Sequence, residues 1–369
     1  MTLTYLDFKM LQLIELHPQI TVQELAKRLD ITWVTAREHL KQLKRKGILA
    51  EPIAVFNPDH LGLERHVVIF KVHTENQIIG LEHACDIHPY THYRSRIYGP
   101  FAGVFAQFDI PSLGNSVLQQ FFEHLQEMEL FDEILLHKST GYRRSTVLDL
   151  QRYNPHTMVW TYNWQNWMKA IREAAQTLPP IKNPSSTDNA FSFIDLQILR
   201  ELTARATIKQ TEIRDKFSLT KSTTSRKIKF IFENYIESIR AQIRRAEFNV
   251  IATKFFYCLN AKPQLRNQLF NAFAAPSCPP FPLSIDLLEE NGVSLWGRMP
   301  PTNEYHLFYT LWEHLPSLQV FTMDTVGSHS RLYWFYPENY DSEASAWRVD
   351  KDYVIDTPLK MLKRKLNSP

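Results

Sequence analysis

Hydrophobic positions in the first fifty residues recur with the spacing of three short helices. Thr21, followed three residues later by Glu24, is a capping-box pair, which opens a helix. Thr32 stands at the start of the third segment and Gly47 at its end, as N-cap and C′ residues do. The three apolar stripes are Met10, Leu13, Ile14 and Leu16, then Val22, Leu25 and Leu29, then Val34, Leu40 and Leu43. Three short helices with a tight turn before the third predict a helix-turn-helix.

The same pattern returns 188 positions later without a gap. Aligned pairs include Leu6 with Ile194, Asp7 with Asp195, Thr32 with Thr220 and Ile48 with Ile236. The turn before the third helix carries Asp30 in the first copy and Ser218 in the second, where a glycine is common. Because serine enters the left-handed region less readily than aspartate, we expect a distorted second turn. The chain should therefore contain two helix-turn-helix units.

Apolar strands and amphipathic helices follow each unit in the order β-α-β-β-α-β, which is the ferredoxin-like arrangement. The expected elements are 66–72, 75–85, 93–98, 101–109, 115–128 and 131–139, and then 252–261, 263–274, 281–290, 292–299, 303–314 and 318–326. The predicted fold class is α+β, with two tandem repeats, each a winged helix-turn-helix followed by a ferredoxin-like domain. The expected domains are 1–60, 61–141, a connection at 142–190, 191–248, 249–330, and a C-terminal extension at 331–369.

Two kinds of sequence make up the connection between the repeats. Residues 178–189, rich in Pro, Ser and Asn, are typical of a linker. Residues 159–174 predict a helix flanked by Trp160, Trp164 and Trp167. These tryptophans could line a ligand pocket, but aromatic residues at helical spacing more often serve packing. We therefore expect them to pack between the two halves.

Basic charge is unevenly distributed along the chain. The 369 residues are 44% hydrophobic and 22% charged, as in ordinary globular proteins, and the net charge is only +3. Residues 1–49 alone carry +3, however, and residues 194–248 carry +5, so the remainder is acidic. Basic charge confined to the two helix-turn-helix segments indicates local contacts with nucleic acid.

Cysteine usage and the lack of long apolar runs suggest an intracellular protein. Cys85, Cys258 and Cys278 are distant in sequence and odd in number, which favours reduced thiols over a disulfide framework. Asp7 and Lys9 interrupt any apolar signal-peptide region, and no apolar run reaches the roughly 18 residues that a membrane span requires. We expect a soluble, cytoplasmic protein.

Four stretches of the first half carry a resemblance: LDFKMLQLI, ITVQELAKRLDITWVTAREHLKQLKRKGIL, FNPDHLGLER and YGPFAGVFAQFDIP, within residues 6–139. On these, the chain resembles the Lrp/AsnC family of prokaryotic transcription regulators. The second half resembles it by analogy with the first and departs at Lys209 and Tyr235. The resemblance implies a small-molecule effector, such as an amino acid, near the turn between the middle strands. Tyr98, Gly99, Gly103 and Gly292 stand there, although Gly99-Pro100 is equally a plain turn.

The third helix of each unit supplies the candidate DNA contacts, because its N-terminal residues reach base edges while flanking cations hold phosphates. The first copy offers Thr32, Trp33, Thr35, Ala36 and Arg37 for bases and Lys41, Lys44, Arg45 and Lys46 for phosphates. The second offers Thr220, Lys221, Ser222, Thr223, Arg226, Lys227 and Lys229, with Arg240, Arg244 and Arg245 on its wing. The alternative is a solvated helix face. Coincidence of charge with a helix-turn-helix in both copies favours DNA.

Metal binding and catalysis are less well supported. His83, Cys85, His88 and His92 cluster, but their spacing is unlike that of zinc sites, so no metal or other cofactor is expected. Siroheme decarboxylases share this architecture, and we would expect a Tyr-Asn-x-Trp-type stretch with His and Arg around their middle strands. Here Tyr162-Asn163-Trp164 lies in the connection instead. The chain also lacks phosphate-loop, G-x-S-x-G and H-E-x-x-H motifs, and we predict that it is not an enzyme.

The sequence thus predicts a sequence-specific transcription regulator that binds double-stranded DNA and is modulated by a small molecule. A siroheme-decarboxylase-like enzyme and a protein-interaction scaffold are the alternatives. Family subunits pair through their sheets, and one chain with two such domains can satisfy that pairing internally, as a pseudo-dimer. The recognition helices ITWVTAREHLK and LTKSTTSRKIK differ, so we expect two unlike half-sites about one or two helical turns apart. Further homo-oligomerisation remains open.

Overall fold

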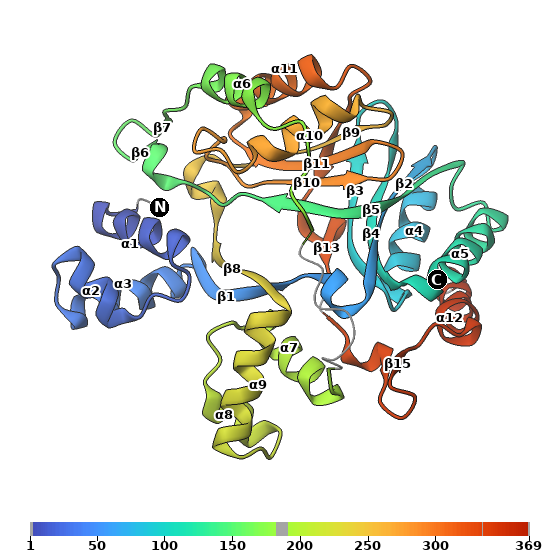
Figure 1. The fold of residues 1–369 in the computed structure, drawn as a ribbon, viewed down its shortest axis with the longest axis horizontal. Helices are drawn as coiled ribbons and strands as arrows, with labels where there is room; N and C mark the ends of the chain where they lie inside the picture. Colours follow the sequence, from blue (N-terminus) through green and yellow to red (C-terminus); the bar gives the residue numbers. More distant parts are fainter. Residues whose placement is uncertain (1–2, 182–190, 334, 368–369) are drawn as a thin grey trace.

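The computed structural model describes residues 3–181, 191–333 and 335–367. Its first helix-turn-helix consists of α1 (Tyr5–Leu16), α2 (Val22–Leu29) and α3 (Trp33–Arg45). The second consists of α7 (Phe193–Ala204), α8 (Gln210–Lys216) and α9 (Lys221–Asn234). In Figure 1 the first unit lies to the left of the β-structure and the second lies below it. None of the described helices is long and apolar enough to cross a membrane.

Local signals in the sequence determine the helix ends. The Thr21 hydroxyl accepts a hydrogen bond from the Glu24 amide at 3.2 Å, and the Glu24 carboxylate accepts one from the Thr21 amide at 2.9 Å. This reciprocal pair satisfies two amides that the first helical turn leaves unbonded. Asp30 and Ser218 both adopt the left-handed conformation, with φ of 53° and 51°. The second turn therefore has the same backbone conformation as the first, and the expected distortion is absent there.

A ferredoxin-like domain follows each unit, in the predicted element order. The first comprises β2 (Leu63–Val72), α4 (Glu75–Ile87), β3 (Thr91–Tyr98), β4 (Ala102–Pro111), α5 (Asn115–Glu127) and β5 (Glu133–Ser145). The second comprises β9 (Ala252–Cys258), α10 (Pro263–Ala272), β10 (Leu283–Leu288), β11 (Gly292–Met299), α11 (Glu304–His314) and β12 (Gln319–Asp324). The predicted α+β class with two such repeats is confirmed.

The two ferredoxin-like sheets join edge to edge into one closed sheet. Its strand order is β12-β9-β11-β10-β5-β2-β4-β3, and β12 pairs back with β3. The junctions are equivalent, because the fourth strand of each repeat pairs with the second strand of the other. Apolar side chains from both repeats fill the interior of this barrel, among them Val67, Ile69, Phe105, Phe255, Leu288 and Phe321. Closure leaves none of these eight strands with an unpaired edge.

The wings of the two helix-turn-helix units also pair with each other. Strand β1 (Leu49–Phe56) and strand β8 (Ile236–Ile243) form a two-stranded antiparallel ribbon, with Leu49 opposite Ile243 and Phe56 opposite Ile236. Short 3-10 helices η1 (Pro58–Leu61) and η4 (Arg245–Phe248) lead from this ribbon to the barrel. The ribbon lies between the helical units and the barrel (Figure 1).

Each repeat ends in a tail that crosses to the other repeat. The first tail has a hairpin, β6 (Tyr153–Asn154) and β7 (Val159–Trp160), and a helix, α6 (Trp164–Glu173), that packs on α10 and α11. The second has β14 (Tyr340–Asp341) and β15 (Ala346–Trp347), and a helix, α12 (Thr357–Leu366), that packs on α4. The residues treated as a plain C-terminal extension therefore fold like the connection between the repeats.

The connection itself bears out the packing interpretation of its tryptophans. Trp167 is fully buried and Trp164 nearly so, in the core that α6 forms with α10. Trp160 is half-buried against the same core. Of the predicted linker 178–189, residues 182–189 lie outside the described residues.

Candidate functional site

The N-terminus of α3 presents an exposed aromatic and cationic surface. The indole of Trp33 is 45% exposed, and the guanidinium carbon of Arg37 lies 5.1 Å from its ring centroid. Thr32 caps the helix by accepting a hydrogen bond from the Thr35 amide at 3.0 Å. Ala36 is fully buried, so the expectation that it contacts a base is corrected here. Its small side chain is needed where α3 packs on the helical core.

The cations expected to hold phosphates on α3 differ in their freedom. Lys41 and Arg45 are exposed. Lys44 is exposed but forms an ion pair with Glu51 at 2.5 Å, and Lys46 is half-buried. Lys41 and Arg45 are consequently the α3 cations most accessible to a phosphate.

Helix α9 presents a comparable surface in the second unit. Thr220, Lys221, Ser222, Arg226 and Lys229 are exposed, and Thr223 is half-buried. Lys227 forms a 2.8 Å ion pair with Asp195 of α7, which diverts its charge from the outer surface.

Two equivalent contacts anchor the recognition helices to the first helices of their units. Lys227 and Asp195 align with His39 and Asp7 of the first copy, where His39 Nδ1 lies 2.8 Å from Asp7 Oδ1. Burial would raise the pKa of Asp7, but hydrogen bonds from His39 and Thr4 outweigh it and lower that pKa. The orientation of each recognition helix is therefore held by a buried aspartate.

The wing arginines do not form the single DNA-facing group that the sequence predicted. Arg244 is exposed and pairs with Glu247 at 2.5 Å. Arg240 and Arg245 instead line a cavity beneath the β1–β8 ribbon. Because β8 is a strand, neighbouring side chains point to opposite faces, and its pairing with β1 sets Arg240 toward the barrel. The predicted role of Arg240 and Arg245 as DNA contacts is corrected accordingly.

The cavity lies between the ribbon and the barrel and has a volume of about 340 Å³. Both repeats contribute to it, and α1 and α7 supply Glu15 and Thr203, which are equivalent positions. Seven Phe, Tyr and Trp side chains form much of its wall: Phe56, Tyr93, Phe105, Phe255, Trp296, Tyr333 and Phe335. The volume is at the lower end of the range for small-molecule sites.

Two of the cavity's arginines already have carboxylate partners. Arg65 forms a bidentate pair with Asp109, with both N···O distances 2.7 Å. Burial would raise the pKa of Asp109, but Arg65 and His92 lower it to about 2. Arg143 donates to Asp59 Oδ2 at 2.5 Å and to Asn57 Oδ1 at 2.7 Å. Both pairs position the polar wall of the cavity.

Two other arginines are largely uncompensated. Arg240 has no hydrogen bond or ion pair within the described parts of the chain. Arg245 approaches Glu15 only at 3.9 Å, and its Nε atom is buried without a hydrogen-bond partner. Desolvation lowers the pKa of both guanidinium groups. Both side chains are half-buried, and Glu237 and Glu15 favour the charge of Arg240 without forming an ion pair with it. A cation partly removed from water without a paired counter-ion is unfavourable, so this side of the cavity favours an anion.

The same region contains a neutral imidazole. Burial lowers the pKa of His92 to about 4, with Arg65 acting in the same direction. The ring is therefore uncharged at neutral pH, and its Nδ1 atom lies 3.2 Å from Asp109 Oδ2. It can serve as a hydrogen-bonding group but adds no positive charge to the cavity.

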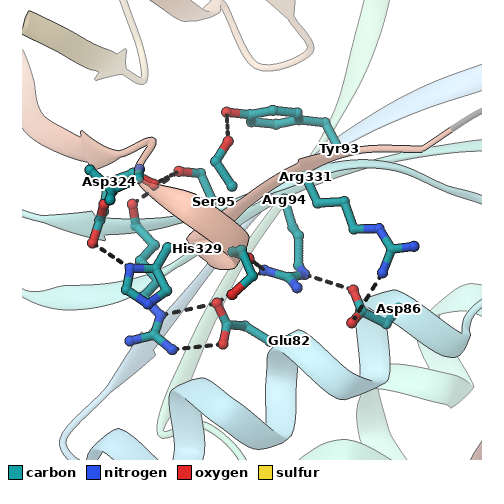
Figure 2. Close-up of polar contacts among 12 residues, drawn as sticks. Glu82, Asp86, Tyr93, Arg94, Ser95, Asp324, His329 and Arg331 are labelled. Atoms are coloured by element: carbon teal, nitrogen blue, oxygen red, sulfur yellow. Dashed lines mark hydrogen bonds and ion pairs between the residues drawn. The ribbon is translucent and has the colours of Figure 1, made fainter. Parts of the chain in front are cut away.

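A network of buried charges fixes the wall that the second repeat contributes (Figure 2). Arg94 of β3, only 4% exposed, pairs with Glu82 at 3.0 Å and with Asp86 at 2.9 Å, both on α4. It also donates to the carbonyl of Ser328 at 3.0 Å. Strand β13 (Ser330–Leu332) is thereby held against β3, and the next residue, Tyr333, reaches the cavity while bonding Asp86.

The residues suggested for an effector lie elsewhere. Tyr98, Gly99 and Gly103 belong to the β3–β4 hairpin, and Gly292 begins β11. A Cβ atom on Gly103 would come within 2.1 Å of the Phe70 carbonyl oxygen, so close approach of the strands requires this glycine. None of the four lines the cavity. Their role in effector binding therefore stays a prediction.

The histidine and cysteine cluster is dispersed by the fold. Cys85 and His88 are buried in the core of the first ferredoxin-like domain, whereas His92 lines the cavity. Burial lowers the pKa of His88 to about 3, and its ring packs on Phe121 with centroids 4.7 Å apart. These contacts are those of packing side chains.

The cavity residues escaped sequence-based prediction because no motif joins them. Arg65 and Arg143 lie on strands β2 and β5, which pair within the first sheet, and Arg240 reaches them only because the β1–β8 ribbon lies over the barrel. One signal was present: Tyr153 to Trp160 has the same spacing as Tyr340 to Trp347, which marks the repeated tails.

Comparison with known proteins places the first helical unit in a described class. Residues 3–50 match the model of winged helix-turn-helix DNA-binding domains. The first unit is therefore a winged helix-turn-helix of the DNA-binding type. A search of curated proteins returned no match.

Solved structures resemble the chain over its whole length. Two structures of the siroheme decarboxylase NirDL, one in co-complex with an iron-uroporphyrin III analogue, cover 98% of this chain and 100% of their own. Their sequence identities are 12% and 13%, and both TM-scores are 0.50. Escherichia coli AsnC covers 38% of this chain and 93% of its own, with 15% identity and a TM-score of 0.31.

The whole-length match corrects one expectation. The chain was predicted not to be an enzyme, because the residues expected of a siroheme decarboxylase were missing from the middle strands. The solved structures that share its complete fold are those of an enzyme, which contradicts that prediction. A likeness at 12–13% identity shows the fold alone, so function depends on the residues that the surfaces and the cavity present.

Proposed function

We propose that the chain is a sequence-specific DNA-binding transcription regulator that responds to a carboxylate-bearing small molecule. The observation that carries DNA binding is the exposed N-terminal face of α3, where Arg37 lies over Trp33. An arginine at this position can form a bidentate contact with guanine, and the exposed indole offers apolar contact with a thymine methyl group. Lys41 and Arg45 would hold phosphates on either side.

Two recognition helices on one molecule favour a composite target. Helices α3 and α9 belong to units that the β1–β8 ribbon joins directly, and Figure 1 shows both projecting away from the barrel. Their exposed residues differ, since α3 offers Trp33 and Arg37 where α9 offers Lys221 and Ser225. We therefore propose a target with two unlike half-sites, each read by one helix.

The cavity supplies the regulatory part of the proposal. Arg240 and Arg245 lack a full counter-charge, and the surrounding aromatic wall suits a ligand with an apolar body. An aromatic compound with two or three carboxylates meets both requirements. Arg240 lies on the ribbon that joins the two helix-turn-helix units, and Glu15 lies in the last turn of α1 in the first unit. Ligand binding there can change the relative orientation of the two recognition helices.

A second candidate function is catalysis in the same cavity. It is favoured by the whole-length similarity to a siroheme decarboxylase together with the arginine-lined wall. In such a reaction a carboxylate of the substrate would leave as CO₂, and the carbon to which it was bonded would take up a proton. A tetrapyrrole exceeds the enclosed volume of about 340 Å³, so this function would need the ribbon to move away from the barrel.

Selection of binding sequences from random duplex DNA tests the first function. We expect an enriched site with two unlike halves, and a log affinity that falls with log salt concentration by about 0.9 per phosphate contacted. Arg37→Ala should relax the preference at one base pair of the enriched site, whereas Arg172→Ala on the distant helix α6 should leave the enriched site unchanged. Failure to enrich any sequence, with no salt-dependent binding, would contradict the DNA-binding proposal and leave a protein-interaction scaffold.

Two experiments distinguish an effector-binding site from a catalytic site. Isothermal titration calorimetry with trimesate, an aromatic tricarboxylate, should show binding that Arg240→Met weakens. Mass spectrometry after incubation with siroheme tests catalysis, because decarboxylation yields a product lighter by CO₂. Binding of trimesate with unchanged siroheme supports an effector site. A lighter siroheme product that Arg240→Met prevents would support the enzyme instead.

A further inference from the structure

Asp286 on β10 is a carboxyl group buried in the wall of the cavity. Its side chain belongs to a residue only 6% exposed, and the Ser139 hydroxyl donates to its Oδ1 atom at 2.5 Å. The Oδ2 atom has no hydrogen-bond partner among the described residues. A carboxylate oxygen left unpaired in a protein interior is costly, whereas a protonated carboxyl can donate to a bound group.

The surrounding charges come from three elements. Arg143 on β5 and Arg65 on β2 favour the ionised form of Asp286, and Asp59 on η1 opposes it. Both arginines direct their shortest hydrogen bonds elsewhere, Arg143 to Asp59 and Arg65 to Asp109. Burial therefore dominates and raises the pKa of Asp286 to about 6. The group titrates in the range where proteins work.

Resting on the ligand site proposed above, we propose that Asp286 carries the proton that accompanies ligand binding, its Oδ2–H donating a hydrogen bond to a carboxylate of the ligand. A ligand carboxylate cannot lie against an ionised Asp286 without strong repulsion. Protonation removes that repulsion and replaces it with a charge-assisted hydrogen bond. Binding above pH 6 should therefore take up one proton.

Glu15 and Glu237 are the other carboxyls that line the cavity; Glu237 is exposed, so the buried Glu15 is the one that must be separated from Asp286. Burial also raises its pKa, although Arg245 and the Leu148 amide lower it. Its Oε1 atom already accepts a hydrogen bond from Leu148 at 3.1 Å and faces Arg245. Its Oε2 atom, like Asp286 Oδ2, has no hydrogen-bond partner among the described residues, but Arg245 lies beside the carboxylate and favours its anion. A ligand carboxylate would therefore compete with Glu15 for Arg245. Glu15→Gln is the matched control.

Calorimetry with trimesate at several pH values, in buffers of different ionisation enthalpy, measures the proton directly. We expect wild-type protein to take up close to one proton at pH 7 and to lose affinity by up to tenfold per pH unit above 6. Asp286→Asn keeps a donor at the same position, so its affinity should be independent of pH with no proton uptake. Glu15→Gln should retain the uptake. Proton uptake that persists in Asp286→Asn, or disappears in Glu15→Gln, would overturn the inference.

A second variant and a ligand-free measurement complete the test. Ser139→Ala removes the hydrogen bond that lowers the pKa of Asp286, so the pH dependence should move to higher pH. Without ligand, the melting temperature of Asp286→Asn should exceed that of wild type more at pH 8 than at pH 4. A melting-temperature difference between Asp286→Asn and wild type that does not change with pH would show that Asp286 does not titrate in this range. If this difference holds but trimesate does not bind, the ligand site fails while the buried acid stands.

Discussion

Trp160 and Trp347 occupy equivalent places in the two repeats, and each indole donates an equivalent hydrogen bond to the other repeat. Trp160 Nε1 donates to the carbonyl of Phe248, and Trp347 Nε1 donates to the carbonyl of Leu61, each at 2.9 Å. Phe248 and Leu61 end the 3-10 helices η4 and η1. Each tail is thereby fixed to the junction between wing and barrel in the other repeat.

These reciprocal contacts predict a measurable loss of stability. Trp347→Phe keeps an aromatic ring but leaves the buried Leu61 carbonyl without its donor, which should lower the free energy of unfolding by about 1–3 kcal/mol. Urea denaturation measures the change. Trp33→Phe on the exposed face of α3 is the control and should alter stability by less than about 0.5 kcal/mol. Equal effects of the two substitutions would contradict a structural role for the Trp347 hydrogen bond.

Arg37 and Arg45 should separate base recognition from phosphate binding. Both are exposed on α3, but Arg37 lies in its first turns and Arg45 ends it. Arg37→Ala should cost about 1–3 kcal/mol on the selected site and relax preference at one base pair. Arg45→Ala should weaken binding to selected and random DNA alike. Competition binding against random duplex measures both, and equal losses for Arg37→Ala would make it a phosphate contact.

Two cavity arginines should respond oppositely to removal. Arg240 lacks an ion-pair partner within the described residues, so Arg240→Met should leave the free energy of unfolding unchanged or raise it by about 1–2 kcal/mol. Arg143→Met breaks contacts with Asp59 and Asn57 and should lower it by about 1–2 kcal/mol, since Asp59 is about one-third exposed. Denaturant unfolding compares them. Strong destabilisation by Arg240→Met would show that its charge is compensated.

Asp109 should make the free energy of unfolding decrease at acidic pH. Burial opposes its charge, but Arg65 and His92 hold its pKa near 2, below the value of an unfolded aspartate. A carboxyl with a lowered folded pKa contributes stability that is present above its unfolded pKa and lost as pH falls through the folded one. We expect about 2–3 kcal/mol to disappear between roughly pH 4 and pH 2.

Asp109→Asn tests this contribution. The variant should be about 3 kcal/mol less stable than wild type at pH 7, because it leaves Arg65 buried without its anion, and the difference should narrow toward pH 2. Thermal unfolding across that range measures it. Asp215→Asn on the exposed face of α8 should show no such convergence. A gap between wild type and Asp109→Asn that stays constant with pH would contradict the assignment.

Local features of the fold could be predicted from the sequence because they depend on neighbours within a few residues. The Thr21–Glu24 capping box forms as predicted, and the period of apolar residues located the helices and strands of both repeats. Strand β5 ran further than expected, to Ser145, because its last residues pair with β10 of the other repeat. That extension depends on a partner almost 140 positions away, which no local pattern encodes.

The candidate site was predicted only where it lies on a single helix. Trp33 and Arg37 are one helical turn apart, so sequence spacing places them on one face. Arg240 and Arg245 are residue types that commonly contact DNA, but Arg240 lies on strand β8 and Arg245 on η4, and both line the cavity. Their tertiary positions, which no local pattern encodes, direct them there. Asp286 carries no sequence signal, because its properties derive from burial and from Ser139 on another strand.

Closure of the barrel also means that one strand edge stays unpaired during translation. Strand β3 is complete at Tyr98, but the partner of its outer edge, β12, is synthesised more than two hundred residues later. At the usual ribosomal rate, that edge waits roughly 10–45 seconds. During this time its unpaired amides and carbonyls can accept a strand from a neighbouring nascent chain on the same messenger RNA. Carrying both repeats on one polypeptide ensures that the correct strand arrives tethered, at a concentration that no neighbouring chain can match.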